Sequence, residues 1–173
     1  LVDGDGVLWV GHSQGLDRHV DGQWHRYRVD DGLGMNRVYD ILEDREGNLW
    51  FAGDGGLSRY DAKGFFRLGR QDGLLSDHVE ALATHPDYGL LIGSDGGLQR
   101  LTPDGPALLG ASARPGLQEM RDIVADGAGG LWAASTRGLH HFDGSAWRSY
   151  TVDDGLVHNW VQAVTPDGEG GVW

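Results

Sequence analysis

The histidines and hydroxyl-bearing residues of this sequence do not form the arrangements expected of an enzyme. None of the eight histidines belongs to a His-Glu-x-x-His pair, which presents two metal ligands on one face of a helix. No nucleophilic serine elbow is expected, and Gly53-Asp54-Gly55-Gly56 lacks the following helix that a phosphate-binding loop needs. The absence of cysteine excludes disulfides, thiolate metal sites and cysteine nucleophiles. We therefore predict that this segment is not an enzyme and holds no cofactor.

Acidic turns could bind a hard cation, because Ca²⁺ prefers clustered oxygen ligands. Such turns occur at Asp3-Gly4-Asp5-Gly6, Asp126-Gly127-Ala128-Gly129 and Asp167-Gly168-Glu169-Gly170. Asp and Gly are also the residues that tight turns between strands use, and these turns recur at a regular spacing. We therefore predict structural turns and no metal site.

Charge limits the partners that this chain can have. Its 14 basic and 26 acidic residues give a net charge of −12, which repels phosphate backbones and anionic lipid surfaces. No apolar stretch approaches the roughly 20 residues that a membrane span requires. We expect neither nucleic-acid binding nor direct membrane contact.

A repeat of 41 residues runs through the whole chain. The Leu-Trp column consists of Leu8-Trp9, Leu49-Trp50, Leu90-Leu91, Leu131-Trp132 and Val172-Trp173. A Gly-Leu column keeps the same spacing at Gly15-Leu16, Gly56-Leu57, Gly97-Leu98 and Gly138-Leu139. Glycine accounts for 30 of the 173 residues, which is too many for helices and fits tight turns between short strands.

Each repeat contains four short apolar runs separated by turn residues. In the best example the runs are residues 38–42, 49–52, 57–60 and 65–68. Four strands per repeat of this length are typical of a β-propeller blade. We predict an all-β fold of four-stranded antiparallel blades, with complete blades at 38–78, 79–119 and 120–160 and partial blades at 1–37 and 161–173.

The positions that recur from repeat to repeat have structural explanations. The glycine that opens each third strand follows a turn that needs positive φ. The tryptophans of the second strands are expected to fill the gap between adjacent blades, which makes Trp9, Trp50, Trp132 and Trp173 core residues. The third repeat departs from the pattern, since Leu91 replaces the tryptophan and Tyr88 replaces the turn glycine.

Binding residues are expected on the face that carries the fourth-to-first and second-to-third strand connections. Residues that break the repeat there are the better candidates, because a ligand breaks the symmetry of a ring. The predicted ligand-binding set is Arg37, His78, Glu119, Arg121 and Trp160, together with the column Asn36, Asp77 and Asn159. That column is also suited to capping the backbone of its own loops. The mixture suits a small molecule, a carbohydrate or a peptide.

The repeat resembles the two-component regulator propeller family. The best examples are Asp44-Arg45-Glu46-Gly47-Asn48-Leu49-Trp50 with Gly56-Leu57-Ser58-Arg59-Tyr60-Asp61, and the linkers Asp31-Gly32-Leu33 and Asp154-Gly155-Leu156. The resemblance implies a seven-bladed propeller in the periplasmic sensor region of a bacterial membrane protein with a histidine kinase or diguanylate cyclase domain. Seven such repeats need about 290 residues, and the chain opens in mid-pattern, so we expect an excised open arc rather than a four-bladed ring.

We therefore expect a periplasmic ligand-sensing segment that contacts neighbouring blades of its parent. Two alternatives remain: a protein-interaction scaffold, and an enzyme of the streptogramin-lyase type whose propeller repeats look similar. Exposed blade edges also make self-association possible.

Overall fold

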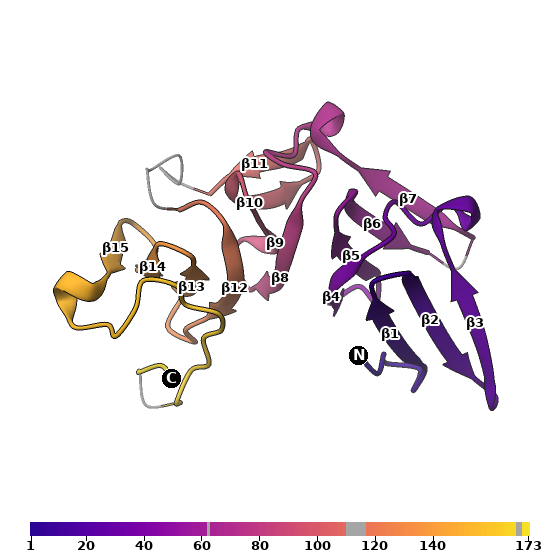
Figure 1. Cartoon of the computed structure of the whole chain (residues 1–173), viewed down its shortest axis with the longest axis horizontal. Helices are drawn as coiled ribbons and strands as arrows, with labels where there is room; N and C mark the ends of the chain where they lie inside the picture. The colour runs from indigo at the N-terminus through magenta and orange to yellow at the C-terminus, as the bar shows by residue number, and fades with distance from the viewer. Residues whose placement is uncertain (62, 110–116, 169–170) are drawn as a thin grey trace. The chain divides into compact units, whose positions relative to one another are not determined.

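The computed structural model describes residues 1–61, 63–109, 117–168 and 171–173 (Figure 1). Apart from three single-turn 3-10 helices, the regular structure in these ranges is β-strand. The chain divides into two compact units, Leu1–Val79 and Glu80–Trp173. The predicted all-β class and the four-stranded antiparallel sheets are confirmed. Residues 110–116, which fall inside the predicted blade 79–119, lie outside the described residues.

The first unit contains one three-stranded and one four-stranded sheet. The first sheet consists of β1 (Leu8–His12), β2 (Gly15–Val20) and β3 (Gln23–Tyr27). The second consists of β4 (Val38–Glu43), β5 (Leu49–Gly53), β6 (Gly56–Tyr60) and β7 (Phe65–Leu68). The 3-10 helices η1 (Val29–Asp31) and η2 (Arg70–Asp72) follow the outer strands β3 and β7. These bounds agree with the four strands predicted for residues 38–68.

The second unit contains two four-stranded sheets, the first of which begins at the boundary residue Val79. That sheet consists of β8 (Val79–His85), β9 (Gly89–Ser94), β10 (Gly97–Thr102) and β11 (Gly105–Leu108). The other consists of β12 (Met120–Ala125), β13 (Leu131–Ser135), β14 (Gly138–Phe142) and β15 (Trp147–Tyr150), followed by η3 (Val152–Asp154). None of the helices among the described residues is long and apolar enough to span a membrane.

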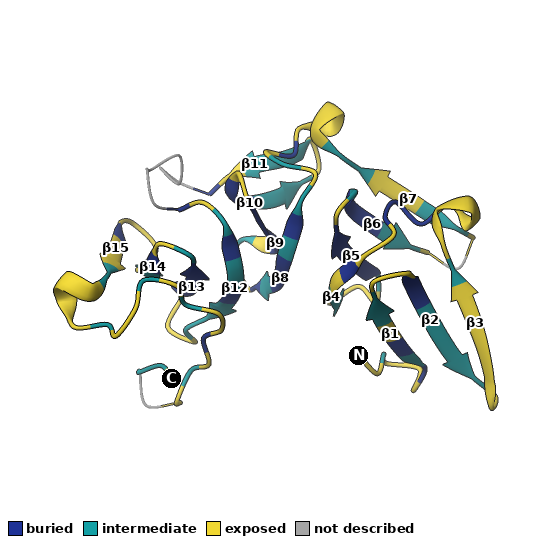
Figure 2. Cartoon of the chain, in the orientation of Figure 1, coloured by how far each residue is buried: buried dark blue, intermediate teal, exposed yellow. Residues whose placement is uncertain are grey.

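Burial follows the position of a strand within its sheet. Every residue of β5 and β13 is buried, whereas the outer strand β3 is exposed over four of its five residues (Figure 2). The glycines that open the third strands have the predicted positive φ, for example 98° at Gly56 and 140° at Gly138. An L-residue with a β-carbon rarely adopts this conformation, so the turns depend on glycine.

Trp9 lies at the centre of the core of the first unit. It contacts the rings of Phe51 and Tyr60 on the neighbouring sheet at centroid distances of 5.6 and 5.3 Å. The prediction that the second-strand tryptophan packs between blades is therefore correct for Trp9. In the second unit, Trp132 is likewise buried in a cluster with Val164 and Val172 of the last described segment.

Trp173 does not follow this prediction, because it is 87 % exposed. Its segment pairs through a β-bridge between Pro166 and Val172 and through reciprocal backbone hydrogen bonds between Thr165 and Trp173.

The acidic turns are held by hydrogen bonds within the repeat. The Asp44 carboxylate accepts from the backbone N–H groups of Glu46 (3.1 Å) and Asn48 (2.8 Å) and from the Trp50 indole (2.7 Å). Asp3 makes the same three contacts with Asp5, Val7 and Trp9. Burial opposes ionisation of Asp44, but the bonds from Trp50 and Asn48 outweigh it and lower the pKa. The turn carboxylates thus bind their own turns.

Replacing Asp44 with Ala should lower the free energy of unfolding by about 2–3 kcal/mol, because a buried indole N–H and two backbone N–H groups lose a charged acceptor. Since the folded-state pKa is lowered, this contribution is present at neutral pH and lost as the pH falls through that pKa. Urea unfolding at neutral pH measures the change. Asp5→Ala, in an exposed position of the equivalent turn, should change stability by less than about 0.5 kcal/mol; equal effects of the two substitutions would contradict this role.

The divergent third repeat replaces the turn aspartate with a histidine. His85 is buried, its Nδ1 accepts from the Asp87 N–H (3.1 Å), and its Nε2 lies 3.2 Å from the Gly130 carbonyl oxygen. In the other repeats the positive φ belongs to a glycine such as Gly47, at the position of Tyr88. Here it belongs to the next residue, Gly89 (71°). The Tyr88 ring stacks on His85 at 4.4 Å. The departures in this turn are therefore a structural substitution that joins β8 to the loop before β13.

Candidate functional site

Two predicted site residues of the first unit, Arg37 and His78, meet around Asp54. His78 Nδ1 lies 3.1 Å from the Asp54 carboxylate, and Arg37 Nε lies 4.0 Å from it. The Tyr39 hydroxyl donates to the same carboxylate at 2.6 Å. We call Arg37, Tyr39, Asp54 and His78 the Asp54 cluster. It is a partly exposed network in which a phenol hydroxyl, an imidazole and a guanidinium converge on one carboxylate.

The electrostatics of the Asp54 cluster keep Tyr39 protonated. Burial raises the pKa of the Tyr39 hydroxyl, and its hydrogen bond to Asp54 raises it further. The ring of Tyr39 lies 5.1 Å from the imidazole of His78 and 6.0 Å from the Arg37 guanidinium. The aromatic ring thus holds the two basic side chains beside the carboxylate.

Close backbone packing fixes the position of Asp54. It lies in the turn between β5 and β6, where Gly53 and Gly55 flank it. A β-carbon at Gly53 would lie 2.0 Å from the Arg37 carbonyl oxygen, and one at Gly55 would lie 1.9 Å from the Gly34 carbonyl oxygen. The two glycines therefore let the turn lie directly against residues 34–37, which brings Asp54 to Arg37.

A hollow of about 250 Å³ opens beside Asp54. Its lining includes Asp77, Arg67 and Gln71. Asp77 accepts from the Arg70 N–H at 2.8 Å, and Arg67 donates to the Gly34 carbonyl oxygen at 3.2 Å. Oppositely charged groups and an amide thus surround a space that could hold a small polar group.

In the second unit, Arg121 and Trp160 lie together. Arg121 pairs with Glu80, and its guanidinium lies 5.9 Å from the centre of the Trp160 ring. Trp160 is 52 % exposed. We call Glu80, Arg121 and Trp160 the Arg121 cluster. An exposed indole beside a paired cation offers both stacking and hydrogen bonding.

Glu119 lies next to this cluster in a strained backbone conformation. Its φ is 55°, which is uncommon for a residue with a side chain. Its side chain accepts a hydrogen bond from the Thr136 hydroxyl, and its N–H donates to the Asp95 carbonyl oxygen at 3.2 Å. These contacts hold Glu119 at the predicted loop end of the sheet.

The column Asn36, Asp77 and Asn159 lies in the loops that follow η1, η2 and η3. Asn159 accepts from the Val152 N–H at 2.8 Å, which is the same contact that Asp77 makes with Arg70. The capping role considered from the sequence thus describes Asp77 and Asn159, while Asn36 is exposed in its loop.

Sequence reasoning missed Tyr39 and Glu80. Both belong to the column that contains Arg121, at the second position of each first strand, where the repeats also disagree (Tyr39, Glu80, Arg121, Gln162). Disagreement in that column was the signal that would have found them.

Sequence reasoning also overlooked that residues Gly11 to Gly15 spell the Gly-x-Ser-x-Gly pattern of serine hydrolases. They form the turn between β1 and β2, in which His12 pairs with Gly15 and the His12 imidazole accepts from the Gln14 N–H at 3.0 Å. A nucleophile elbow needs a strand followed by a helix. This hairpin turn does not provide that geometry.

Sheets of four antiparallel strands, repeating every 41 residues, define the chain as a segment of a β-propeller. Residues 32–55 match the family described as two component regulator propeller. Residues 32–55 are thus similar to one repeat of that family. No curated protein sequence matches the chain.

Solved structures support the propeller fold over the whole chain. The extracellular domain of the hybrid two component system BT4673 from B. thetaiotaomicron is 20 % identical with a TM-score of 0.81, and the match covers 100 % of this chain and 27 % of that domain. The corresponding domain of BT3049 from the same organism is 21 % identical with a TM-score of 0.56, covering 99 % and 30 %. The chain thus spans less than a third of these domains.

An enzyme shares the fold as well. A catalytically inactive virginiamycin B lyase from Staphylococcus aureus, with quinupristin, is 15 % identical with a TM-score of 0.72, and the match covers 100 % of this chain and 60 % of the lyase. Likeness at these identities is a likeness of fold.

Proposed function

We propose that this chain is an extracytoplasmic, ligand-sensing propeller segment of a bacterial membrane signalling protein. The observation that carries the proposal is the pairing of a two component regulator propeller repeat with polar networks built from the residues that break the repeat. The similar domains from B. thetaiotaomicron are extracellular parts of two component systems, which supports an extracytoplasmic location. We also propose that the segment lies in the periplasm and that the longer protein carries a histidine kinase or diguanylate cyclase domain.

The Asp54 cluster is the binding site that we propose in the first unit. A hydroxyl, an imidazole and a guanidinium already surround Asp54, and the adjacent hollow offers Asp77 and Gln71 to the hydroxyl or amide groups of a small ligand. These groups are partly exposed and already held in place. They can therefore replace their mutual contacts with hydrogen bonds to a ligand at low entropic cost.

Ligand screening with matched variants tests this proposal. A panel of saccharides, amino acids and short peptides is titrated against the purified chain, and the midpoint of thermal unfolding is recorded. The binding ligand should lose about tenfold or more in affinity in Asp54→Asn, because a charge-assisted hydrogen bond contributes about 1.5–3 kcal/mol. His78→Gln should weaken binding in the same direction.

Asp154→Asn is the matched control, because Asp154 accepts from the Thr151 N–H at the start of η3 in the second unit and lies outside the Asp54 cluster and its hollow. It should leave ligand affinity unchanged. If Asp54→Asn and His78→Gln bind every ligand as the unaltered chain does, the Asp54 cluster is not the binding site.

The two alternatives make different predictions. A scaffold would recover a stable protein partner in a pull-down and would respond to no small ligand. An enzyme like the lyase would show turnover that depends on His78 and Glu119. In this structure His78 is bound to Asp54 and Glu119 to Thr136, each within its own unit.

A further inference from the structure

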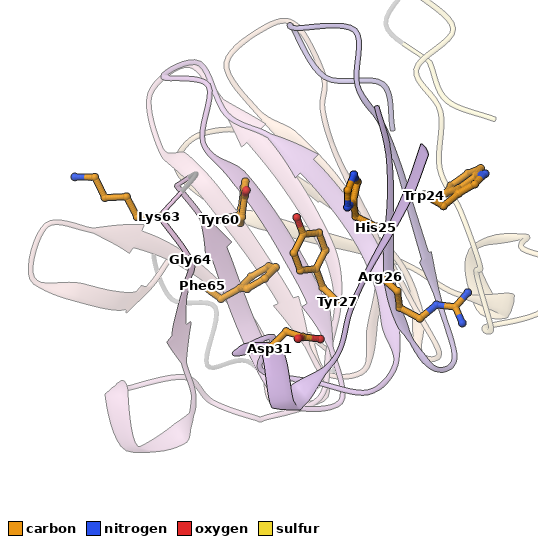
Figure 3. A pocket seen from close by; sticks show the side chains of 9 residues that line it. All are labelled: Trp24, His25, Arg26, Tyr27, Asp31, Tyr60, Lys63, Gly64 and Phe65. Carbon is orange, nitrogen blue, oxygen red and sulfur yellow. The ribbon is translucent and has the colours of Figure 1, made fainter. Parts of the chain in front are cut away.

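A second groove lies in the first unit, at the outer rim of the seam between its two sheets (Figure 3). Its volume is about 580 Å³, within the range of small-molecule sites. One wall comes from β3 and η1, and the other comes from β6, β7 and the turn that joins them. It does not include any residue of the Asp54 cluster.

Three half-buried aromatic residues form the floor of the groove. Phe65 lies 5.3 Å from Tyr27 and 5.2 Å from Tyr60, measured between ring centroids. Burial raises the pKa of the Tyr60 hydroxyl, and the neighbouring Tyr27 hydroxyl raises it further. The Tyr60 phenol therefore remains neutral and can both donate and accept hydrogen bonds.

Opposite charges flank these rings. Figure 3 shows Asp31 below Tyr27 and Lys63 on the far side of Tyr60. Asp31 uses one oxygen to accept from the Arg28 N–H at 2.9 Å, and its carboxylate is exposed. Lys63 is the only lysine of the chain; its side chain points away from the rings in Figure 3, and its flexible stem lets the ammonium group turn toward a ligand. The third charged lining residue, Arg26, is neutralised by Asp17 at 2.7 Å.

The equivalent seam of the second unit is closed. Leu109, Phe142 and Trp147 occupy the positions of Tyr27, Tyr60 and Phe65, and all three are buried in an apolar cluster. The half-buried rings and their hydroxyl groups are thus particular to the seam of the first unit. Simple maintenance of the propeller does not require them.

From these features we propose that the groove binds a short peptide with free termini. The peptide amine pairs with Asp31 and its terminal carboxylate with Lys63, while an apolar side chain packs on Phe65. The tyrosine hydroxyls bond to the peptide amides. Opposite charges on different sides of the rings match a peptide, whose amine and carboxylate are separated, better than a single amino acid, whose two charges are adjacent.

Titration with the tripeptide Gly-Phe-Gly, followed by amide NMR shifts, tests this site. Shifts are expected at residues 25–27 and 63–65. Asp31→Asn and Lys63→Gln should each weaken binding about two- to fivefold, the range of an exposed ion pair. Asp31→Asn should have no effect on the N-acetylated peptide, and Lys63→Gln should have none on the C-amidated peptide.

Asp72→Asn serves as the control for the cap, because Asp72 holds η2 as Asp31 holds η1. It should leave peptide binding unchanged. The proposal is overturned if capped and free peptides bind equally, if shifts lie elsewhere, or if the groove prefers a neutral disaccharide such as cellobiose. These outcomes are separate from the fate of the Asp54 cluster, whose residues the test does not alter.

Discussion

Trp9→Ala is expected to lower the free energy of unfolding by about 3–5 kcal/mol, the cost of removing a large ring from a packed core. Trp9 is 1 % exposed and contacts Tyr27, Phe51 and Tyr60. Its loss would leave a cavity between the two sheets of the first unit, because the strands on both sides are held in register by their own hydrogen bonds. A fall of this size approaches the total stability of many domains.

Trp9 also donates a hydrogen bond to the Asp3 turn, and a second variant separates this role from the packing of the ring. The indole N–H donates to Asp3 at 2.7 Å, and the Arg18 guanidinium lies 5.4 Å from the ring. Trp9→Phe keeps most of the ring packing and should cost about 1–3 kcal/mol, since Asp3 and the cavity edge lose a partner. Denaturant unfolding followed by circular dichroism measures both variants.

Trp173→Ala is the matched control at the same position of the repeat. Its side chain is exposed, so the substitution should change stability by less than about 0.5 kcal/mol. A cost for Trp9→Ala no larger than for Trp173→Ala would show that the tryptophan column does not hold the sheets together.

The architecture could be predicted because it depends on local patterns that repeat. Strands such as Phe65–Leu68 lie where apolar runs end at turn residues, and the turn glycines have positive φ where a strand must reverse within two residues. Each repeat therefore predicts the same four strands independently of the others.

The candidate site could be predicted only in part, because its contacts join residues that are far apart in the repeat. Tyr39 was overlooked although it donates to Asp54, fifteen residues away along the chain. The groove at Tyr27 and Tyr60 was also missed, because nothing in the repeat pattern shows that these two rings lie beside each other. Only the packing of one sheet against the next shows which aromatic residues stay open to solvent.

His140 should make the stability of the second unit depend on pH. It is 1 % exposed on β14, with Nε2 2.9 Å from the Ser135 hydroxyl oxygen and Nδ1 2.8 Å from that of Ser149. Burial lowers the pKa of this imidazole to about 4, from 6.5. No carboxylate is among the partners that the structure gives it, so the protonated form has no compensating charge nearby.

The direction follows from which state binds the proton. Between pH 6.5 and pH 4 the unfolded chain takes up a proton on His140 that the folded protein excludes. The neutral imidazole therefore contributes its full stability above pH 6.5 and loses it as the pH falls toward 4. At 1.36 kcal/mol per pKa unit, the loss between pH 7 and pH 5 is about 2 kcal/mol.

His140→Gln should remove most of that pH dependence while retaining a side chain that can bond to a serine hydroxyl. The free energy of unfolding is measured in urea at pH 7 and pH 5 for both proteins, a range chosen to lie above most carboxylate titrations. His25→Gln, at an exposed position of β3, is the control. If the unaltered chain and His140→Gln lose the same stability between these pH values, the proton is taken up elsewhere. If His140→Gln loses less stability than the unaltered chain between these pH values and His25→Gln does not, the proton is taken up on the buried His140 ring. There, desolvation opposes the positive charge.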